Sequence, residues 1–188
     1  MERLIEQLER YTPWNEQEER DRALMLEQLK HGVTPLCREN EIVHFTASAW
    51  IVNPARTKVL MIYHNIYQSW AWTGGHADGE ADLLAVALRE AREESGIEHI
   101  RPVTDDVFSI ETLHVAGHEK RGRYVPCHLH MNLTYLLEAD ENDALAVKPD
   151  ENSGVAWIPM DDMEHRVSEQ WMIERIYRKL NAKLSQVQ

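Results

Sequence analysis

The chain has 188 residues, of which 43% are hydrophobic and 28% are charged, a length and composition typical of one globular domain. Its formal net charge of −12 would repel phosphate backbones and anionic headgroups, so neither a nucleic-acid polymer nor a membrane is an expected partner. No apolar run approaches the roughly 18 residues that cross a bilayer, and Cys37 and Cys127 lack the spacing of a zinc ribbon.

The first 40 residues are predicted to form a helical extension that packs on a main domain at residues 41–188. Apolar residues recur at helical spacing through residues 1–31, and Pro13 interrupts them at a position that suits a first helical turn. The opening residues, MERLIEQLER, are acidic and amphipathic and lack the apolar segment of a secretory signal. Together with the low cysteine content, this predicts a cytoplasmic protein.

The segment after the extension is predicted to be a β-hairpin. Ile42–Val52 is rich in β-branched and aromatic residues, as strands are. Asn53–Arg56 is typical of a turn, and it leads into a second strand at Lys58–Tyr63.

The remaining elements alternate between strands and helices. In chain order they are a loop at Thr73–Gly75, a helix at Asp82–Ser95 that ends at Gly96, strands at Val107–Val115 and Tyr124–Leu137 joined by polar residues 117–123, a short strand at Val155–Pro159 and a closing helix at Glu169–Leu184. Sheet segments interrupted by one helix and closed by another predict an α/β (α+β) fold with a mixed sheet between helices.

The helix at Asp82–Ser95 carries an unusual set of acids. Glu90 and Glu94 fall on its apolar face, and Glu93 lies at the edge of that face. Three carboxylates near the C-terminal end repel one another and oppose the helix dipole. Mg²⁺ would offset that repulsion, because it prefers carboxylate oxygens. The alternative is a solvated acidic surface, but the glycines on both sides of the helix favour a metal site.

The segment around this helix resembles the Nudix box, G-x5-E-x7-R-E-U-x-E-E-x-G-U, in which U is aliphatic. Gly75 begins the box, and the residues at the matching offsets are Arg89, Glu90, Ala91, Glu93, Glu94, Gly96 and Ile97. The order of the flanking strands, loops and helices is similar to the α/β/α sandwich of that family. The stretches HFTASAWIVNP and CHLHMNLTY are similar to a subgroup of bacterial Nudix proteins.

The resemblance implies a divalent-metal-dependent hydrolase that cleaves a diphosphate linkage in a small molecule of the nucleoside-diphosphate-X type. Its cofactor would be Mg²⁺ or Mn²⁺, bound by Glu90, Glu93, Glu94 and the carbonyl of Gly74. Arg89 would fix the orientation of Glu90. The expected partner is a small phosphorylated substrate, and a homodimer is left open.

The resemblance also implies a further acid from outside the box. Such families often recruit one from the loop before a tryptophan-bearing strand, and Glu151, six residues before Trp157, is the candidate. Glu151 would bind metal or take the proton from the attacking water, a role for which Glu90 is the alternative. An exposed loop acid without function is the other interpretation of Glu151.

The box departs from the family pattern at one position, because its first Glu is replaced by Ala81. That Glu normally braces the box arginine. Asp82 lies two helical turns before Arg89 on nearly the same azimuth and is the candidate substitute. Ala81 is also the only support for a second hypothesis, a catalytically weak or silent Nudix-fold sensor that binds a phosphorylated metabolite.

Several residues outside the box are candidates for substrate binding. His128 and His130 alternate on a predicted strand, so both imidazoles would point to one face and line a pocket. A zinc site and an ordinary hydrogen-bonded wall of the sheet are the alternatives. His76 would approach a phosphate, and Arg121, in the only local basic cluster, would meet a distal phosphate unless it is simply a solvated turn residue. Trp70, Trp72 and Tyr67, which precede the box, are interpreted as core rather than as a nucleobase platform.

Overall fold

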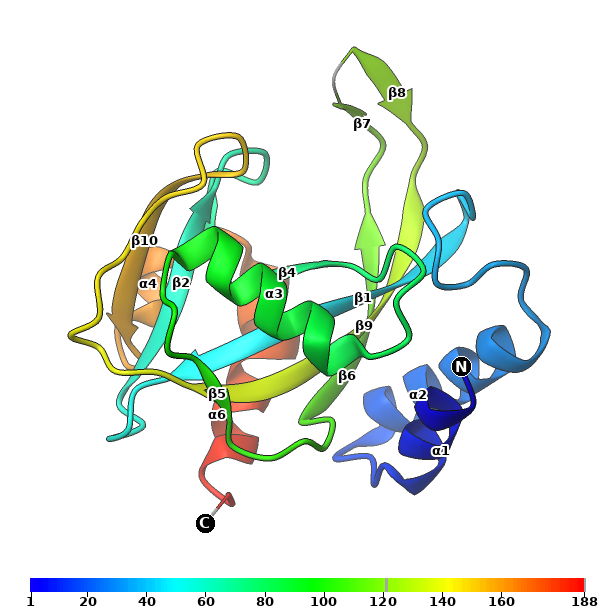
Figure 1. Cartoon of the computed structure of the whole chain (residues 1–188), viewed down its shortest axis with the longest axis horizontal. Coiled ribbons are helices and arrows are strands. Elements are labelled where there is room, and N and C mark those ends of the chain that lie inside the picture. Colours follow the sequence, from blue (N-terminus) through cyan, green and yellow to red (C-terminus); the bar gives the residue numbers. More distant parts are fainter. Residues whose placement is uncertain (121, 188) are drawn as a thin grey trace.

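The structure, a computed structural model, describes residues 1–120 and 122–187, with the side chain of Lys120 excepted. Its centre is a mixed eight-stranded sheet with the main order β10-β2-β1-β9-β5, in which β3 pairs with β2, β4 with β1 and β6 with β9 (Figure 1). The strands are β1 (Val43–Val52), β2 (Lys58–His64), β3 (Ser69–Ala71), β4 (Thr73–His76), β5 (Arg101–Pro102), β6 (Ser109–Val115), β9 (His128–Glu138) and β10 (Asn152–Pro159).

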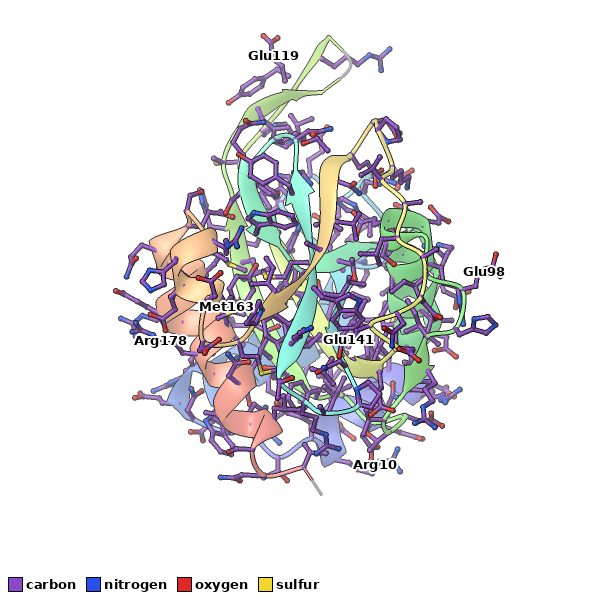
Figure 2. The ribbon with its side chains drawn as sticks, turned by 90° about the vertical axis from the view of Figure 1, so that its left-hand side faces the viewer. Arg10, Glu98, Glu119, Glu141, Met163 and Arg178 are labelled. Carbon is purple, nitrogen blue, oxygen red and sulfur yellow. The ribbon has the colours of Figure 1, made fainter. Side chains whose placement is uncertain are left out.

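Helices cover both faces of this sheet. They are α1 (Glu2–Arg10), α2 (Glu16–His31), α3 (Leu83–Ser95), α4 (Met163–Arg166), α5 (Gln170–Met172), the π-helical turn η1 (Ile173–Tyr177) and α6 (Arg178–Leu184). Figure 2 shows α3, which ends shortly before the labelled Glu98, on one side of the strands and the C-terminal helices, around the labelled Arg178, on the other. The predicted α/β/α sandwich is therefore confirmed. None of the helices in the described residues combines the length and the apolar composition that crossing a membrane requires.

The central strand β1 has two different buried faces because its side chains alternate. Phe45, Ala47 and Ile51 belong to one apolar cluster with α3. Trp50 faces the other way and stacks on Tyr177 of η1, with ring centroids 5.3 Å apart. β1 pairs in parallel with β9 along its length and in antiparallel fashion with β2 at one end, where Val52 lies opposite Val59. The predicted hairpin is therefore correct at its turn, but most of β1 pairs elsewhere.

Two predicted elements differ from the structure. Thr73–Gly75, the predicted loop, belongs to β4, which pairs antiparallel with residues 46–49 of β1. Glycines carry no side chains that would signal a strand, and a Cβ on Gly74 would lie 2.7 Å from the carbonyl oxygen of Ala47. The predicted strand Tyr124–Leu137 is interrupted at Pro126, which has no N–H for the ladder. Its first part is β8 (Arg123–Val125), which pairs with β7 (His118–Lys120) in a ribbon that projects from the domain (Figure 1).

The two N-terminal helices contact the strands and helices that follow them. Leu4 and Leu8 of α1 are fully buried in the same apolar cluster as β1 and α3. Glu18 of α2, also fully buried, lies 2.8 Å from the Nζ of Lys183 and 3.1 Å from that of Lys179, both on α6. Burial alone would raise the pKa of Glu18, but the two lysines lower it to about 2. The boundary at residue 40 stays a prediction.

Candidate active site

The three box acids form a gradient of exposure along the end of α3. Glu94 is buried, and its Oε2 accepts a 2.9 Å hydrogen bond from the backbone N–H of Gly74. The side chain of Glu90 is 14% exposed, whereas that of Glu93 is 47% exposed. The azimuths predicted from the sequence are thus confirmed: two acids lie on the inner face of α3 and one lies at its rim.

Glycine at position 75 allows the β4 backbone to approach this helix closely. A Cβ there would lie 2.7 Å from the Cγ of Glu90. Arg89 holds the same carboxylate from the solvent side, with Nη2 3.0 Å from Oε1 of Glu90 and Nε 4.0 Å from Oε1 of Glu93. This contact is the one that an orienting role for Arg89 requires, and the role itself stays a prediction.

The loop before β10 brings Glu151 to the box acids. The Nζ of Lys148 lies 3.0 Å from Oε2 of Glu93 and 3.1 Å from Oε2 of Glu151, so one ammonium group bridges the two carboxylates. Asn152 is fully buried and donates from Nδ2 to the backbone oxygen of Glu94 over 3.0 Å, which fixes the loop to the end of α3. Glu151 is therefore linked through Lys148 to Glu93, one of the box acids, and its role as an additional acid stays a prediction.

The electrostatics of the cluster are set by the burial of Glu94 close to other acids. Burial raises the pKa of Glu94 to about 8; the Gly74 hydrogen bond opposes this shift, and the charges of Glu151 and Glu90 add to it. Burial alone would lower the pKa of Lys148, but its hydrogen bonds to Glu93 and Glu151 raise it. Converging carboxylate oxygens with too little compensating positive charge fit a hard divalent cation such as Mg²⁺ or Mn²⁺.

Asp82 does not take the place of the missing box Glu. Its Oδ1 accepts a 3.2 Å hydrogen bond from the N–H of Ala85 as the N-cap of α3, and its Oδ2 lies 3.6 Å from Nη1 of Arg3. Arg89 instead turns toward the box acids that follow it in the sequence. The expectation that Asp82 braces Arg89 is corrected, because an N-cap side chain points back to the first turn and not along the helix.

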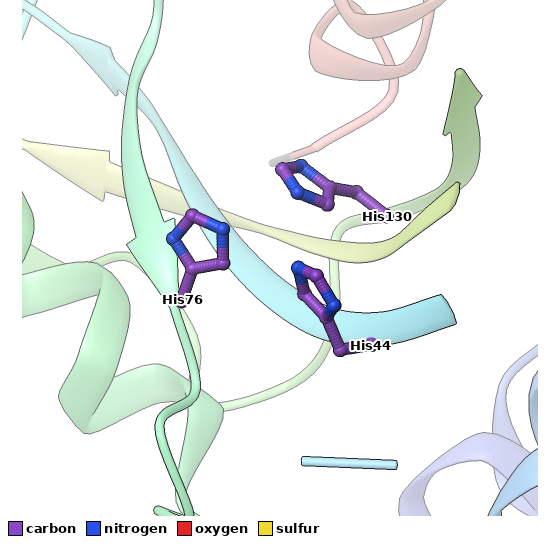
Figure 3. Close-up of side chains that lie close together, drawn as sticks. All are labelled: His44, His76 and His130. Atoms are coloured by element: carbon purple, nitrogen blue, oxygen red, sulfur yellow. The ribbon is translucent and has the colours of Figure 1, made fainter. Parts of the chain in front are cut away.

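The histidines predicted to bind substrate meet at one end of the sheet. His128 and His130 of β9 lie with their Nε2 atoms 3.1 Å apart. His76 of β4 lies next to His130, with ring centroids 4.8 Å apart. They are joined by His44 of β1, which the sequence analysis did not single out (Figure 3). Burial, followed by the neighbouring imidazoles, lowers the pKa of His130 to about 2. Whether these histidines bind substrate stays a prediction.

Other predicted residues fall into two groups. Trp70 and Trp72 are half-buried and pack against the apolar cluster beneath the C-terminal helices, in agreement with their interpretation as core. The same interpretation is wrong for Tyr67, which is 47% exposed because it lies in the turn between β2 and β3 and not on a strand. Arg121, predicted to meet a distal phosphate, lies outside the described residues. Lys148 and Asn152 were missed by sequence reasoning because a lysine and an asparagine in a polar loop carry no periodic signal.

Comparison with known proteins agrees with this fold. The family model of the NUDIX domain matches residues 42–180. This match covers more than half of the chain and therefore shows its family. The chain belongs to the Nudix family and is a Nudix hydrolase. No curated protein matches the chain.

Solved structures of low sequence identity share the fold. A C. elegans Ap4A hydrolase in a binary complex is 21% identical, with a TM-score of 0.54 over 75% of this chain and 94% of that one. The M. smegmatis Nudix hydrolase RenU is 16% identical, with a TM-score of 0.56 over 77% and 88% of the two chains. The E. coli dihydroneopterin triphosphate pyrophosphohydrolase is 13% identical, with a TM-score of 0.53 over 72% and 92%.

Proposed function

We propose that the chain hydrolyses a diphosphate linkage in a small molecule of the nucleoside-diphosphate-X type, with Mg²⁺ or Mn²⁺ as cofactor. The observation that carries the proposal is the buried carboxylate of Glu94, held by Gly74 beside Glu90 and Glu151. Glu90, Glu93, Glu94 and the carbonyl oxygen of Gly74 would hold the cation. When bound, it would neutralise phosphate oxygens and lower the pKa of water.

The residues of the chain have separate tasks in this proposal. Arg89 orients the carboxylate of Glu90 through their 3.0 Å ion pair. Glu151 takes the proton from the attacking water, because the box acids are committed to the cation. Its ion pair with Lys148 holds Glu151 close to Glu93.

The class of substrate is proposed from the names of the structural neighbours and from the charge of the site. An Ap4A hydrolase and a dihydroneopterin triphosphate pyrophosphohydrolase are named for phosphorylated small molecules, and both share this fold. A net charge of −12 disfavours a polymeric phosphate backbone, while a bound divalent cation reverses the local sign for a small substrate. Free thiols at Cys37 and Cys127 support a reducing, cytoplasmic location.

A second candidate function is a sensor that binds a phosphorylated metabolite without turning it over. Ala81 in place of the box Glu favours it, because Asp82 does not replace the missing brace. The close contact of Arg89 with Glu90 favours catalysis instead.

The two candidates are separated by a substrate screen. Nucleotide sugars, dinucleoside polyphosphates, ADP-ribose, coenzyme A and nucleoside triphosphates would be incubated with the protein and Mg²⁺ or Mn²⁺, and the products would be resolved by chromatography. We expect metal-dependent cleavage of at least one class. Metal-dependent binding of a compound that stays intact would favour the sensor.

A further inference from the structure

Four histidines from three strands gather on the face of the sheet opposite α3, at the end where β1 and β9 begin. His44 and His130 lie opposite each other in the parallel pairing of β1 and β9. His76 lies opposite Thr46 at the end of β4. One nitrogen from each of these three rings lies within 4.8 Å of those from the other two (Figure 3). His128 completes the group, with its ring centroid 4.9 Å from those of both His44 and His130.

The backbone sets the tautomer of two of these rings. Nδ1 of His44 lies 2.9 Å from the carbonyl oxygen of Asn40, so it carries the hydrogen and leaves the lone pair on Nε2. That Nε2 is buried and has no hydrogen-bond partner among the described residues. Nδ1 of His128 lies 2.8 Å from the carbonyl oxygen of Pro126 in the same way. A metal-ligating histidine usually donates a hydrogen bond from its other ring nitrogen, and a backbone carbonyl is a common acceptor.

Hydrogen bonds among the four histidines do not explain the buried Nε2 of His44. Nε2 of His128 lies 3.1 Å from Nε2 of His130, so that contact holds a single proton. Nε2 of His44 is buried and has no partner in the part of the chain that the structure describes. A buried polar atom without a partner destabilises the folded state. An anion would require protonated imidazoles, which burial of the group disfavours. A cation that accepts imidazole lone pairs satisfies both observations.

We propose that His44, His76 and His130 bind a divalent transition-metal ion of the zinc type, with His128 adjoining the site. Neutral imidazole nitrogens suit Zn²⁺ and do not suit Mg²⁺, so this site is chemically distinct from the carboxylates of α3. Tetrahedral zinc with Zn–N bonds of about 2.0–2.1 Å places its nitrogens about 3.3 Å apart. The three nitrogens lie within 4.8 Å of one another, so the rings would have to rotate to bring them closer when the ion binds.

The position of His76 gives this metal site a structural role, which is separate from the hydrolysis proposed above. It stands two residues after Gly74, whose N–H holds Glu94, and directly after Gly75, which packs against Glu90. A metal shared by His76, His44 and His130 ties the end of β4 to β1 and β9. It therefore stabilises the glycine strand on which the box acids rest.

The test is zinc binding by the full-length chain, first stripped of metal. Zn²⁺ would be titrated against a chromophoric chelator in excess Mg²⁺, which saturates the carboxylate site. We expect one zinc per chain that Mg²⁺ does not displace, and a rise in melting temperature when zinc binds. His44→Ala and His130→Ala should each weaken zinc binding at least about tenfold. His114→Ala is the matched control, since His114 is exposed on β6 of the same sheet, and Glu93→Gln should leave zinc binding intact.

X-ray absorption of the zinc-loaded wild type provides a measurement that does not depend on the folding of variants. Three or four nitrogen ligands at about 2.0–2.1 Å are expected. Zinc that Mg²⁺ displaces, a shell dominated by oxygen, or unchanged affinity in folded His44→Ala and His130→Ala would overturn the proposal. None of these results would affect the Mg²⁺-dependent hydrolysis proposed for the carboxylates.

Discussion

The carboxylate of Glu94 accepts a 2.9 Å hydrogen bond from the backbone N–H of Gly74, which lies twenty residues earlier in the chain. This bond joins the end of α3 to β4 and holds the buried carboxylate of Glu94 against the backbone of β4. Glu90 is held against the next residue of the same strand, Gly75. The candidate active site is therefore a junction of one helix end and one glycine strand.

Gly75→Ala should displace Glu90, because the new Cβ would lie 2.7 Å from its Cγ. We expect turnover to fall at least about tenfold, as misplacement of reacting groups by about 1 Å does, while circular dichroism remains that of a folded protein. Gly117→Ala is the control, since a Cβ there meets the outer end of the exposed Tyr124 side chain. Equal turnover in the two variants would show that turnover does not depend on the exact position of the Glu90 carboxylate.

The stability of the metal-free protein should depend on the ionisation of Glu94. The pKa of Glu94 is about 8 in the folded protein, against an ordinary value of 4.5. The protonated side chain therefore contributes fully to stability below about pH 4.5. This contribution is lost as the pH rises toward 8, because the unfolded chain releases the proton first. Relative to Glu94→Gln, the metal-free wild type should thus lose stability between pH 5 and pH 8 in urea denaturation. Mg²⁺ should restore it at pH 8. A constant difference between the two proteins across this range would contradict the burial argument.

Asp82→Ala should affect stability more than catalysis. Loss of the N-cap of α3 is expected to cost about 1 kcal/mol of unfolding free energy, whereas kcat should stay within about twofold of wild type because Arg89 pairs with Glu90 and Glu93. Denaturation curves and steady-state kinetics measure the two effects separately. A large loss of kcat with unchanged stability would instead restore Asp82 as a brace for Arg89.

Glu151→Gln tests the general base. We expect kcat to fall about 100-fold or more with little change in KM, the pattern of an interaction made mainly in the transition state. The limb of the pH–rate profile that reports the base should disappear. Asp150→Asn, one residue earlier, is the matched control. An unchanged kcat would remove Glu151 from the mechanism and leave Glu90 as the candidate base.

Much of the fold is predictable from the sequence where local patterns decide it. The helix Asp82–Ser95 and its end at Gly96 follow from apolar spacing and from the left-handed conformation that glycine adopts, here with φ +74°. β4 escapes prediction because its conformation depends on pairing with β1 and not on its own residues. The parallel pairing of β1 with β9 joins segments more than 80 residues apart, which no local pattern encodes.

The residues of the candidate sites also differ in how far local sequence patterns predict them. Glu90, Glu93 and Glu94 sit on one helix, so their spacing places them without knowledge of the fold. Lys148 and His44 act only through partners from distant segments, and a single histidine at the start of an apolar strand carries no signal of its own. Tertiary contacts, therefore, supply what the sequence pattern lacks.

The most direct test of the central claim is product formation with and without a divalent cation in wild type, Glu93→Gln and Glu98→Gln. Glu98 is an exposed acid just beyond α3 and serves as the control. We expect hydrolysis of a diphosphate substrate that requires Mg²⁺ or Mn²⁺, falls by orders of magnitude in Glu93→Gln and is unchanged in Glu98→Gln. Turnover in Glu93→Gln within a few fold of wild type, or hydrolysis that survives removal of the metal, would contradict the account.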